Sequence, residues 1–506
     1  MASAAAWLVR GRWLGVAPRL LAPLVGLFVG IVSGSISREP AYVWSTMAGA
    51  TAFSEVAHHF HRNLRPAPRR GRLSALFLLL LTGVALLQAA RFSLFMVDPD
   101  FRPGWSVPFA VEPPAHMCLS AYLHAAELNR NGVTGLYEPS HYDPGAKRVS
   151  GEMSRAGAHT NISGMQRYMK DPFQYPPQVL LLPRLTLAVT NDFLAIRTCW
   201  YALLVVGMLA LLQGLVTLVP HRMDVWAFAP LALFWVCLPV LTTFEYGQPH
   251  ALVLLGTVWA FQLFDRERIW LGGSVLAVMI LTKLFPGLLL GFLLGRGKVA
   301  PLLTTMVAVS MITLVSLPII GVDAFIEFLS FQLPRLLNGE AFAPYIGPSE
   351  IGSYQMSLSG IMLRFGAMSS SSVALQTATH WASLAYLALI ITWGFWVGRY
   401  WSSGFTALGL VNLAASGSYY APAAYVLSGT FLVLMLGSCQ VRDRPSRVAV
   451  LGILWLLLEV ANSSGAIPRL WRMSTTREIL MAFAFLIVLA VNAWISARSR
   501  LWIATQ

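Results

Sequence analysis

The chain has 506 residues, of which 56% are hydrophobic and only 11% are charged. Soluble domains contain about 25% charged residues, so this composition excludes a water-soluble globular protein, and it also excludes intrinsic disorder. The net charge is +14, but the basic residues lie in short clusters between apolar runs. That pattern is typical of the cytoplasmic loops of membrane proteins rather than of nucleic-acid binding. We therefore predict an all-α, polytopic membrane protein.

The N-terminal part contains two apolar runs, 14–34 and 40–58, followed by the densest basic cluster of the chain, residues 62–72. Clustered Lys and Arg mark the cytoplasmic side, so the two runs should form a hairpin with a cytoplasmic N-terminus. This predicts an N-terminal membrane hairpin with a basic cytoplasmic loop, residues 1–72, and a main transmembrane domain, residues 73–506.

The main domain should cross outward at 73–96 and continue into residues 97–175, which are polar and rich in Pro and Gly. Long ordered loops are usually functional, so we predict a large extracytoplasmic loop here and a second one at 321–372. Chemistry is therefore expected on the outer face. The apolar run 176–190 is predicted to be a re-entrant or interfacial helix packed under the first loop.

The remaining apolar runs predict further membrane-spanning helices. Their expected ranges are 197–219, 225–243, 249–264, 270–295, 300–320, 373–398, 403–416, 421–438, 446–463 and 478–496. All the intervening basic loops can be cytoplasmic only if 270–295 enters and returns as two half-helices. Lys283 and Pro286 in the middle of that run support a break, because proline disrupts a helix interior. Broken helices at membrane depth line protein or a wet cavity, so this break is a candidate site.

Three polar motifs interrupt the apolar framework. Phe173–Pro177, with the pattern F-x-Y-P-P, opens the 176–190 helix; Phe244–His250 forms a polar turn between two spans; and Lys283 lies in the broken helix. An ionisable residue within the membrane indicates function by default, and an ammonium group suits a phosphate. The structural alternatives are an aromatic helix start, a hairpin turn without a ligand, and a lysine whose head group reaches water.

In this order and spacing, the three motifs resemble glycosyltransferase family 87. This family of integral-membrane GT-C enzymes includes mycobacterial polyprenol-phosphate-mannose-dependent mannosyltransferases. Gly132–Tyr137 is similar to the family's G-x-x-x-L-Y segment in the first outer loop, and Tyr354–Leu358 with Arg364 is similar to its N-Q-S-L…R segment. The resemblance covers about 75–470, and the hairpin at 14–58 looks like an addition.

The resemblance implies a GT-C-like helical bundle that moves a sugar, a hexose such as mannose or a pentose, from a polyprenyl-phosphate donor. The acceptor would be a glycolipid or glycan on the extracytoplasmic face of a bacterial plasma membrane. Lys283, with Arg335 or Arg364 from the second outer loop, would meet the donor phosphate, while Gln248 and Tyr175 would line the sugar site. No cofactor or metal ion is expected, because Lys and Arg can neutralise a phosphate leaving group. Membrane lipids, the donor and the acceptor are the expected partners, without nucleic acid.

The catalytic carboxylate is the point at which the sequence departs from the family. Members carry an aspartate in a D-x-x-x-Y motif of the first outer loop, and matching its tyrosine to Tyr122 places Cys118 at the aspartate position. A thiol is a poor substitute for a carboxylate base. The remaining candidates are Asp100, Asp98 and Glu112. Asp100 ranks first, because Asp98 is closer to the bilayer and suits an interfacial cap.

Two alternatives to an active transferase stay open at this point. Broken helices with an ionisable residue near the membrane midplane are typical of secondary transporters, so a transporter or flippase of a lipid-linked substrate is one. Against it, no internal repeat relates the two halves of the sequence. The other is a catalytically inactive paralogue, favoured by Cys118 and by the segment 416–422, which lacks the histidine that the family tends to place there.

Overall fold

The computed structural model describes a helical core of the chain. The described residues are 89–96 (without 91 and 95), 118–142, 159–216 (without 169), 238–342, 357–362 (without 361), 373–400, 404–417 and 426. Asp98, Asp100, Glu112 and Arg364 lie outside these residues, as do the N-terminal hairpin and the spans predicted after 421. Within the described ranges all regular elements are helices, and a single isolated β-bridge joins Ser163 to Asp192.

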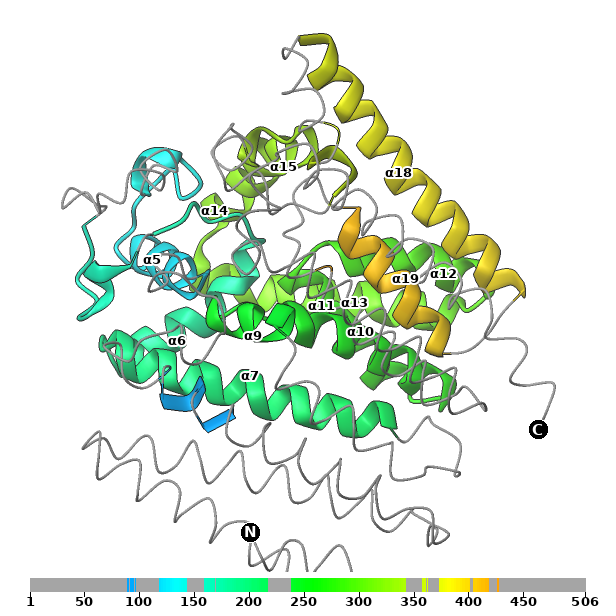
Figure 1. The fold of residues 1–506 in the computed structure, drawn as a ribbon, viewed down its shortest axis with the longest axis horizontal. Coiled ribbons are helices and arrows are strands. Elements are labelled where there is room, and N and C mark those ends of the chain that lie inside the picture. The colour runs from blue at the N-terminus through cyan, green and yellow to red at the C-terminus, as the bar shows by residue number, and fades with distance from the viewer. Residues whose placement is uncertain are drawn as a thin grey trace, which may run out of the picture.

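Most of the described α-helices coincide with apolar runs of the sequence, and the others lie in the predicted outer loops. The described α-helices are α5 (Cys118–Arg130), α6 (Leu181–Val189), α7 (Phe193–Val216), α9 (Leu238–Glu245), α10 (His250–Asp265), α11 (Ile269–Thr282), α12 (Leu290–Gly295), α13 (Val299–Ile320), α14 (Val322–Glu327), α15 (Leu333–Asn338), α18 (Val373–Tyr400) and α19 (Gly404–Ser416). Figure 1 shows α5, α14 and α15 towards the upper left of the view, with α18 running along the right edge. Helix α7 starts before the predicted residue 197, because the Asp192 side chain accepts a hydrogen bond from the Leu194 N–H (3.0 Å) and so caps the helix.

The break predicted in 270–295 is confirmed. Helix α11 ends at Thr282, Lys283 adopts an extended backbone (φ −147°, ψ 131°), and a short 3-10 turn, η7 (Phe285–Leu289), leads into α12. At the far ends of the pair, Arg296 Nη2 donates to Asp265 Oδ1 at 2.7 Å. The chain therefore returns to the side from which it left, as a re-entrant pair requires.

Among the described residues, two helices are long and apolar enough to cross a membrane: α13, over Val299–Ile320, and the part of α18 over Thr377–Arg399. Large hydrophobic side chains of α13 are 42–60% exposed; they are Val299, Leu303, Met306, Val307, Met311, Leu314, Val315 and Ile319. Exposing this much apolar surface to water is unfavourable by about 25 cal/mol per Å², whereas lipid accepts it without cost. This face of α13 therefore suits contact with lipid tails.

The described part of the predicted first outer loop is an ordered helical unit rather than a simple connection. Its helix α5 is buried along most of its length and packs against α6. Asn129 joins three elements, because its side chain accepts from Arg184 of α6 (2.6 Å) and donates to the carbonyl of Ile320 at the end of α13 (2.8 Å). The short helix predicted within 176–190 is thus present and lies on α5.

Candidate active site

The three sequence motifs meet at one cluster. Gln248 Nε2 donates to the Tyr175 hydroxyl at 2.7 Å, and Lys283 Nζ lies 5.9 Å from the centre of the Tyr175 ring. Lys283 Nζ also lies 3.5 Å from His250 Nδ1. Tyr175 precedes the short helix η5 (Pro177–Leu180), Gln248 and His250 stand at the start of α10, and Lys283 ends α11. Segments far apart in the sequence therefore bring an ammonium, an imidazole, an amide and a phenol together.

Helix α5 adds the position at which the family motif carries its aspartate. Cys118 is 7% exposed, and its backbone N–H donates to the Tyr246 carbonyl at 2.8 Å. Its thiol is close enough to Lys283 for the two groups to interact electrostatically. One turn later, the Tyr122 ring packs edge-to-face on Tyr175 with centroids 4.8 Å apart, and burial raises the Tyr122 pKa well above its usual value. A carboxylate at position 118 would therefore belong to the same cluster as Lys283.

The turn that presents Gln248 is rigidly held. Gly247 has φ +65°, and a Cβ atom there would lie 3.1 Å from Leu119 Cβ, so a glycine fits this position best. The Gln248 N–H donates to the Thr243 carbonyl at 3.0 Å, and Trp200 Nε1 donates to the Gly247 carbonyl at 2.8 Å. The Gly-Gln pair of the motif thus fixes the amide and the start of α10 against α5 and α7.

The G-x-x-x-L-Y segment connects the two predicted outer loops. Gly132 closes the end of α5 with φ +71°, a conformation that favours glycine at a helix C-terminus. The backbone N–H groups of Leu136 and Tyr137 donate to the two carboxylate oxygens of Glu327, at 2.9 and 2.8 Å. The Tyr137 hydroxyl donates to the Tyr175 carbonyl at 2.9 Å. This segment therefore connects Glu327, at the end of α14, to the cluster around Tyr175.

Comparison with known proteins agrees with the motifs. Residues 173–418 match the family model of glycosyltransferase family 87. This matched part of the chain belongs to the family. A curated relative is the polyprenol-phosphate-mannose-dependent alpha-(1-2)-phosphatidylinositol pentamannoside mannosyltransferase of Mycobacterium tuberculosis (strain CDC 1551 / Oshkosh), which is 26% identical over 288 residues. The alignment covers 53% of this chain and 61% of the relative, so the chain spans less than two thirds of that protein.

The family assignment confirms the resemblance on which the site was predicted. The matched range contains Tyr175, Gln248 and Lys283, which the structure brings together. Family 87 glycosyltransferases are membrane proteins, and the exposed apolar face of α13 agrees with this. The chain is therefore a membrane protein, while its number of spans and the side of the membrane that the cluster faces stay predictions.

Arg335, which was predicted to meet the donor phosphate with Lys283, makes other contacts. Arg335 is engaged locally, with its Nε 3.1 Å from Glu340 Oε1 and its guanidinium 4.5 Å from the centre of the Phe331 ring. Asp98, Asp100, Glu112 and Arg364 are outside the described residues, so their roles stay predictions. Sequence reasoning did not assign roles to His250 or Glu327. His250 lies in the polar turn that the sequence already singled out, whereas Glu327 carried no local signal.

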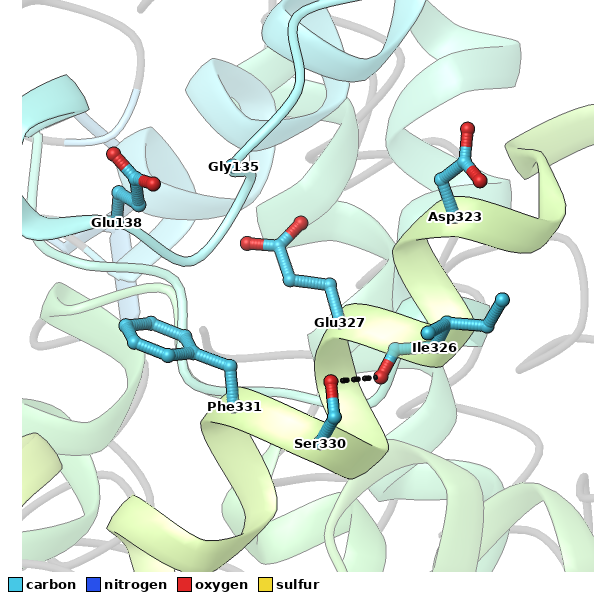
Figure 2. A pocket seen from close by; sticks show the side chains of 7 residues that line it. All are labelled: Gly135, Glu138, Asp323, Ile326, Glu327, Ser330 and Phe331. Carbon is cyan, nitrogen blue, oxygen red and sulfur yellow. Dashed lines mark hydrogen bonds between the residues drawn. The ribbon is translucent and has the colours of Figure 1, made fainter.

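Replacing Glu327 by Gln is expected to lower the free energy of unfolding by roughly 1.5–3 kcal/mol, the usual effect of losing a hydrogen bond to a charged group. The carboxylate now accepts hydrogen bonds from two backbone N–H groups. In the variant, the amide NH₂ would face one of these N–H groups, and two donors cannot form a hydrogen bond with each other. Figure 2 shows Glu327 beside Gly135, in a cavity of about 380 Å³ that Glu138 and Asp323 also line. Thermal unfolding in detergent micelles would measure the change.

The control for Glu327→Gln is Glu138→Gln, a carboxylate in the same cavity whose side chain is exposed and bonds only weakly to Ser140 (3.4 Å). This variant should unfold at the wild-type temperature. Equal effects of the two substitutions would show that the connection between the two predicted outer loops does not depend on the Glu327 carboxylate.

Proposed function

We propose that the chain is a glycosyltransferase that moves a sugar from a polyprenyl-phosphate donor to a glycolipid or glycan acceptor. Mannose is the first candidate among hexoses, because the curated relative is named as a polyprenol-phosphate-mannose-dependent mannosyltransferase. The observation that carries the proposal is the position of Lys283 in a break between two helices, in one cluster with Gln248 and Tyr175. The protein would work as a multi-pass protein of a bacterial plasma membrane, with this cluster on the extracytoplasmic face.

In this reaction the bond between the sugar C1 atom and the phosphate oxygen breaks, and the acceptor hydroxyl oxygen forms a new bond to C1. The departing polyprenyl phosphate keeps the electron pair of the broken bond. The Lys283 ammonium would stabilise the phosphate by a charge-assisted hydrogen bond. A carboxylate would take the proton of the acceptor hydroxyl, and Asp100, followed by Asp98 and Glu112, is the candidate for this role.

The Lys283 cluster also bears on the transporter alternative. A re-entrant pair with an ionisable residue is found in transporters as well as in transferases. Membership of glycosyltransferase family 87 favours the transferase.

The experiment is a transfer assay with the full-length protein in liposomes, using polyprenyl-phosphate mannose labelled in the sugar and a phosphatidylinositol mannoside acceptor. Label in the acceptor supports the proposal, whereas movement of the intact donor across the bilayer without transfer would identify a flippase.

With Asp100 as the base, Cys118→Asp should leave the transfer rate within a few-fold of the wild type, whereas a rise of tenfold or more would show that the base was lost at position 118. The substitution would place a carboxylate within electrostatic range of Lys283, at the position where the family motif has its aspartate, and a positioned general base contributes about 10²–10⁴ in rate. The control is Cys118→Asn, which has a similar shape but no basic oxygen and should not accelerate transfer. If the two variants have the same rate, the base of this protein comes from another segment and position 118 has no catalytic part.

A further inference from the structure

His250 is the group closest to the Lys283 ammonium among the contacts described for the cluster. It is the first residue of α10, it is 3% exposed, and its Nδ1 atom lies 3.5 Å from Lys283 Nζ. Its ring packs against Phe285 at a centroid distance of 5.4 Å, so it contacts both sides of the helix break. The imidazole is therefore fixed by α10 on one side and by η7 on the other.

The chemistry of the two groups fixes the direction of their hydrogen bond. A lysine ammonium has three N–H donors and no acceptor, so His250 Nδ1 must accept. The imidazole is then neutral and carries its proton on Nε2. A partly buried ammonium needs such an acceptor, because burying a charge without a hydrogen-bond partner is costly.

The turn from Gly247 to His250 contacts Lys283 by two routes. His250 contacts the Lys283 ammonium directly. Gln248 acts indirectly, because its 2.7 Å hydrogen bond to the Tyr175 hydroxyl fixes the ring over which the Lys283 ammonium lies. Lysine has four rotatable side-chain bonds, so fixing its ammonium group in one place costs side-chain entropy. Because this turn already orders the Lys283 side chain in the protein without ligand, that entropy is not lost again when the ligand binds.

We propose that His250 is a positioning residue that holds the Lys283 ammonium, through its Nδ1 atom, at the place where the donor phosphate binds. This inference rests on the proposed function, since it takes the phosphate of a polyprenyl phosphate as the ligand of Lys283. It assigns His250 no proton transfer with the substrate.

Two substitutions at this position separate the hydrogen bond from the volume of the ring. His250→Asn keeps an acceptor oxygen close to the place of Nδ1, whereas His250→Phe keeps the ring and its contact with Phe285 but has no acceptor. With polyprenyl phosphate as the probe, His250→Phe is expected to weaken binding roughly tenfold, and His250→Asn is expected to recover most of the loss. Binding would be measured by titration of the full-length protein in detergent micelles.

A double-substitution cycle with Lys283→Ala tests whether His250 acts through the lysine. When Lys283 is already alanine, His250→Phe should cause no further loss of binding. Wild-type affinity in His250→Phe, or a further tenfold loss in the double variant, would overturn the inference. Binding is measured without sugar transfer. If the variants show the expected order of affinities but the protein transfers no sugar, only the proposed function is contradicted.

Discussion

Replacing Asp100 by Asn is expected to lower the rate of sugar transfer by a factor of about 10²–10⁴, the usual cost of losing a general base. Asp100 follows the predicted 73–96 span, so its side chain should lie near the membrane surface, where a polyprenyl phosphate presents its sugar. With a thiol at position 118, the proton of the acceptor hydroxyl needs another carboxylate. Initial rates at saturating donor and acceptor would measure the effect.

The controls for Asp100→Asn are Asp98→Asn and Glu112→Gln. We expect Asp98 to serve as an interfacial cap and the two prolines after Glu112 to point that carboxylate elsewhere, so both variants should stay within a few-fold of the wild type. A loss at one of these two positions instead would move the role of base to that residue. Full transfer in all three variants would place the catalytic carboxylate elsewhere in the chain.

Replacing Lys283 by Ala is expected to weaken binding of the donor by about 1.5–3 kcal/mol, which corresponds to roughly 10- to 150-fold in affinity. The substitution removes the ammonium from the cluster of Tyr175, Gln248 and His250. Lys283→Arg should recover part of the loss, because it keeps the charge but not the compact head group. Titration with polyprenyl phosphate would measure the affinities.

The control for Lys283→Ala is Lys298→Ala. Lys298 is an exposed lysine just before α13, next to the Arg296–Asp265 ion pair at the opposite end of the broken helix pair. Its loss should leave donor affinity unchanged. If donor affinity is unchanged in Lys283→Ala as well, Lys283 is a structural lysine whose head group reaches water, and the phosphate site lies elsewhere.

The sequence predicted the break at Lys283 correctly, because two independent arguments agree there. Proline at 286 disfavours a continuous helix, and the basic loops at both ends require an even number of crossings. The Arg296–Asp265 ion pair could not be predicted, since a charge pattern shows which side a loop faces but not which side chains meet. Helix α7 begins earlier than the predicted residue 197, because the cap at Asp192 sets its start and the hydrophobic pattern does not.

The candidate site could be predicted only in part. The family resemblance selected Tyr175, Gln248 and Lys283, and the structure places them together. The resemblance gave no role to His250. A histidine in a polar turn has the same sequence pattern whether it contacts a lysine or lies on the surface. Glu327 was missed because its hydrogen bonds reach back to Leu136 and Tyr137, a pairing that local patterns do not encode.

The bond between Glu327 and Tyr137 also sets an order of events during synthesis. The two residues are 190 positions apart, so at 5–20 residues per second the ribosome needs roughly 10–40 s to reach Glu327 after it has made Tyr137. During that interval the nascent first loop has been made but its distant anchor has not. The Glu327 anchor of this loop can therefore form only after α13 and α14 have been made, and until then the loop is open to chaperones and proteases.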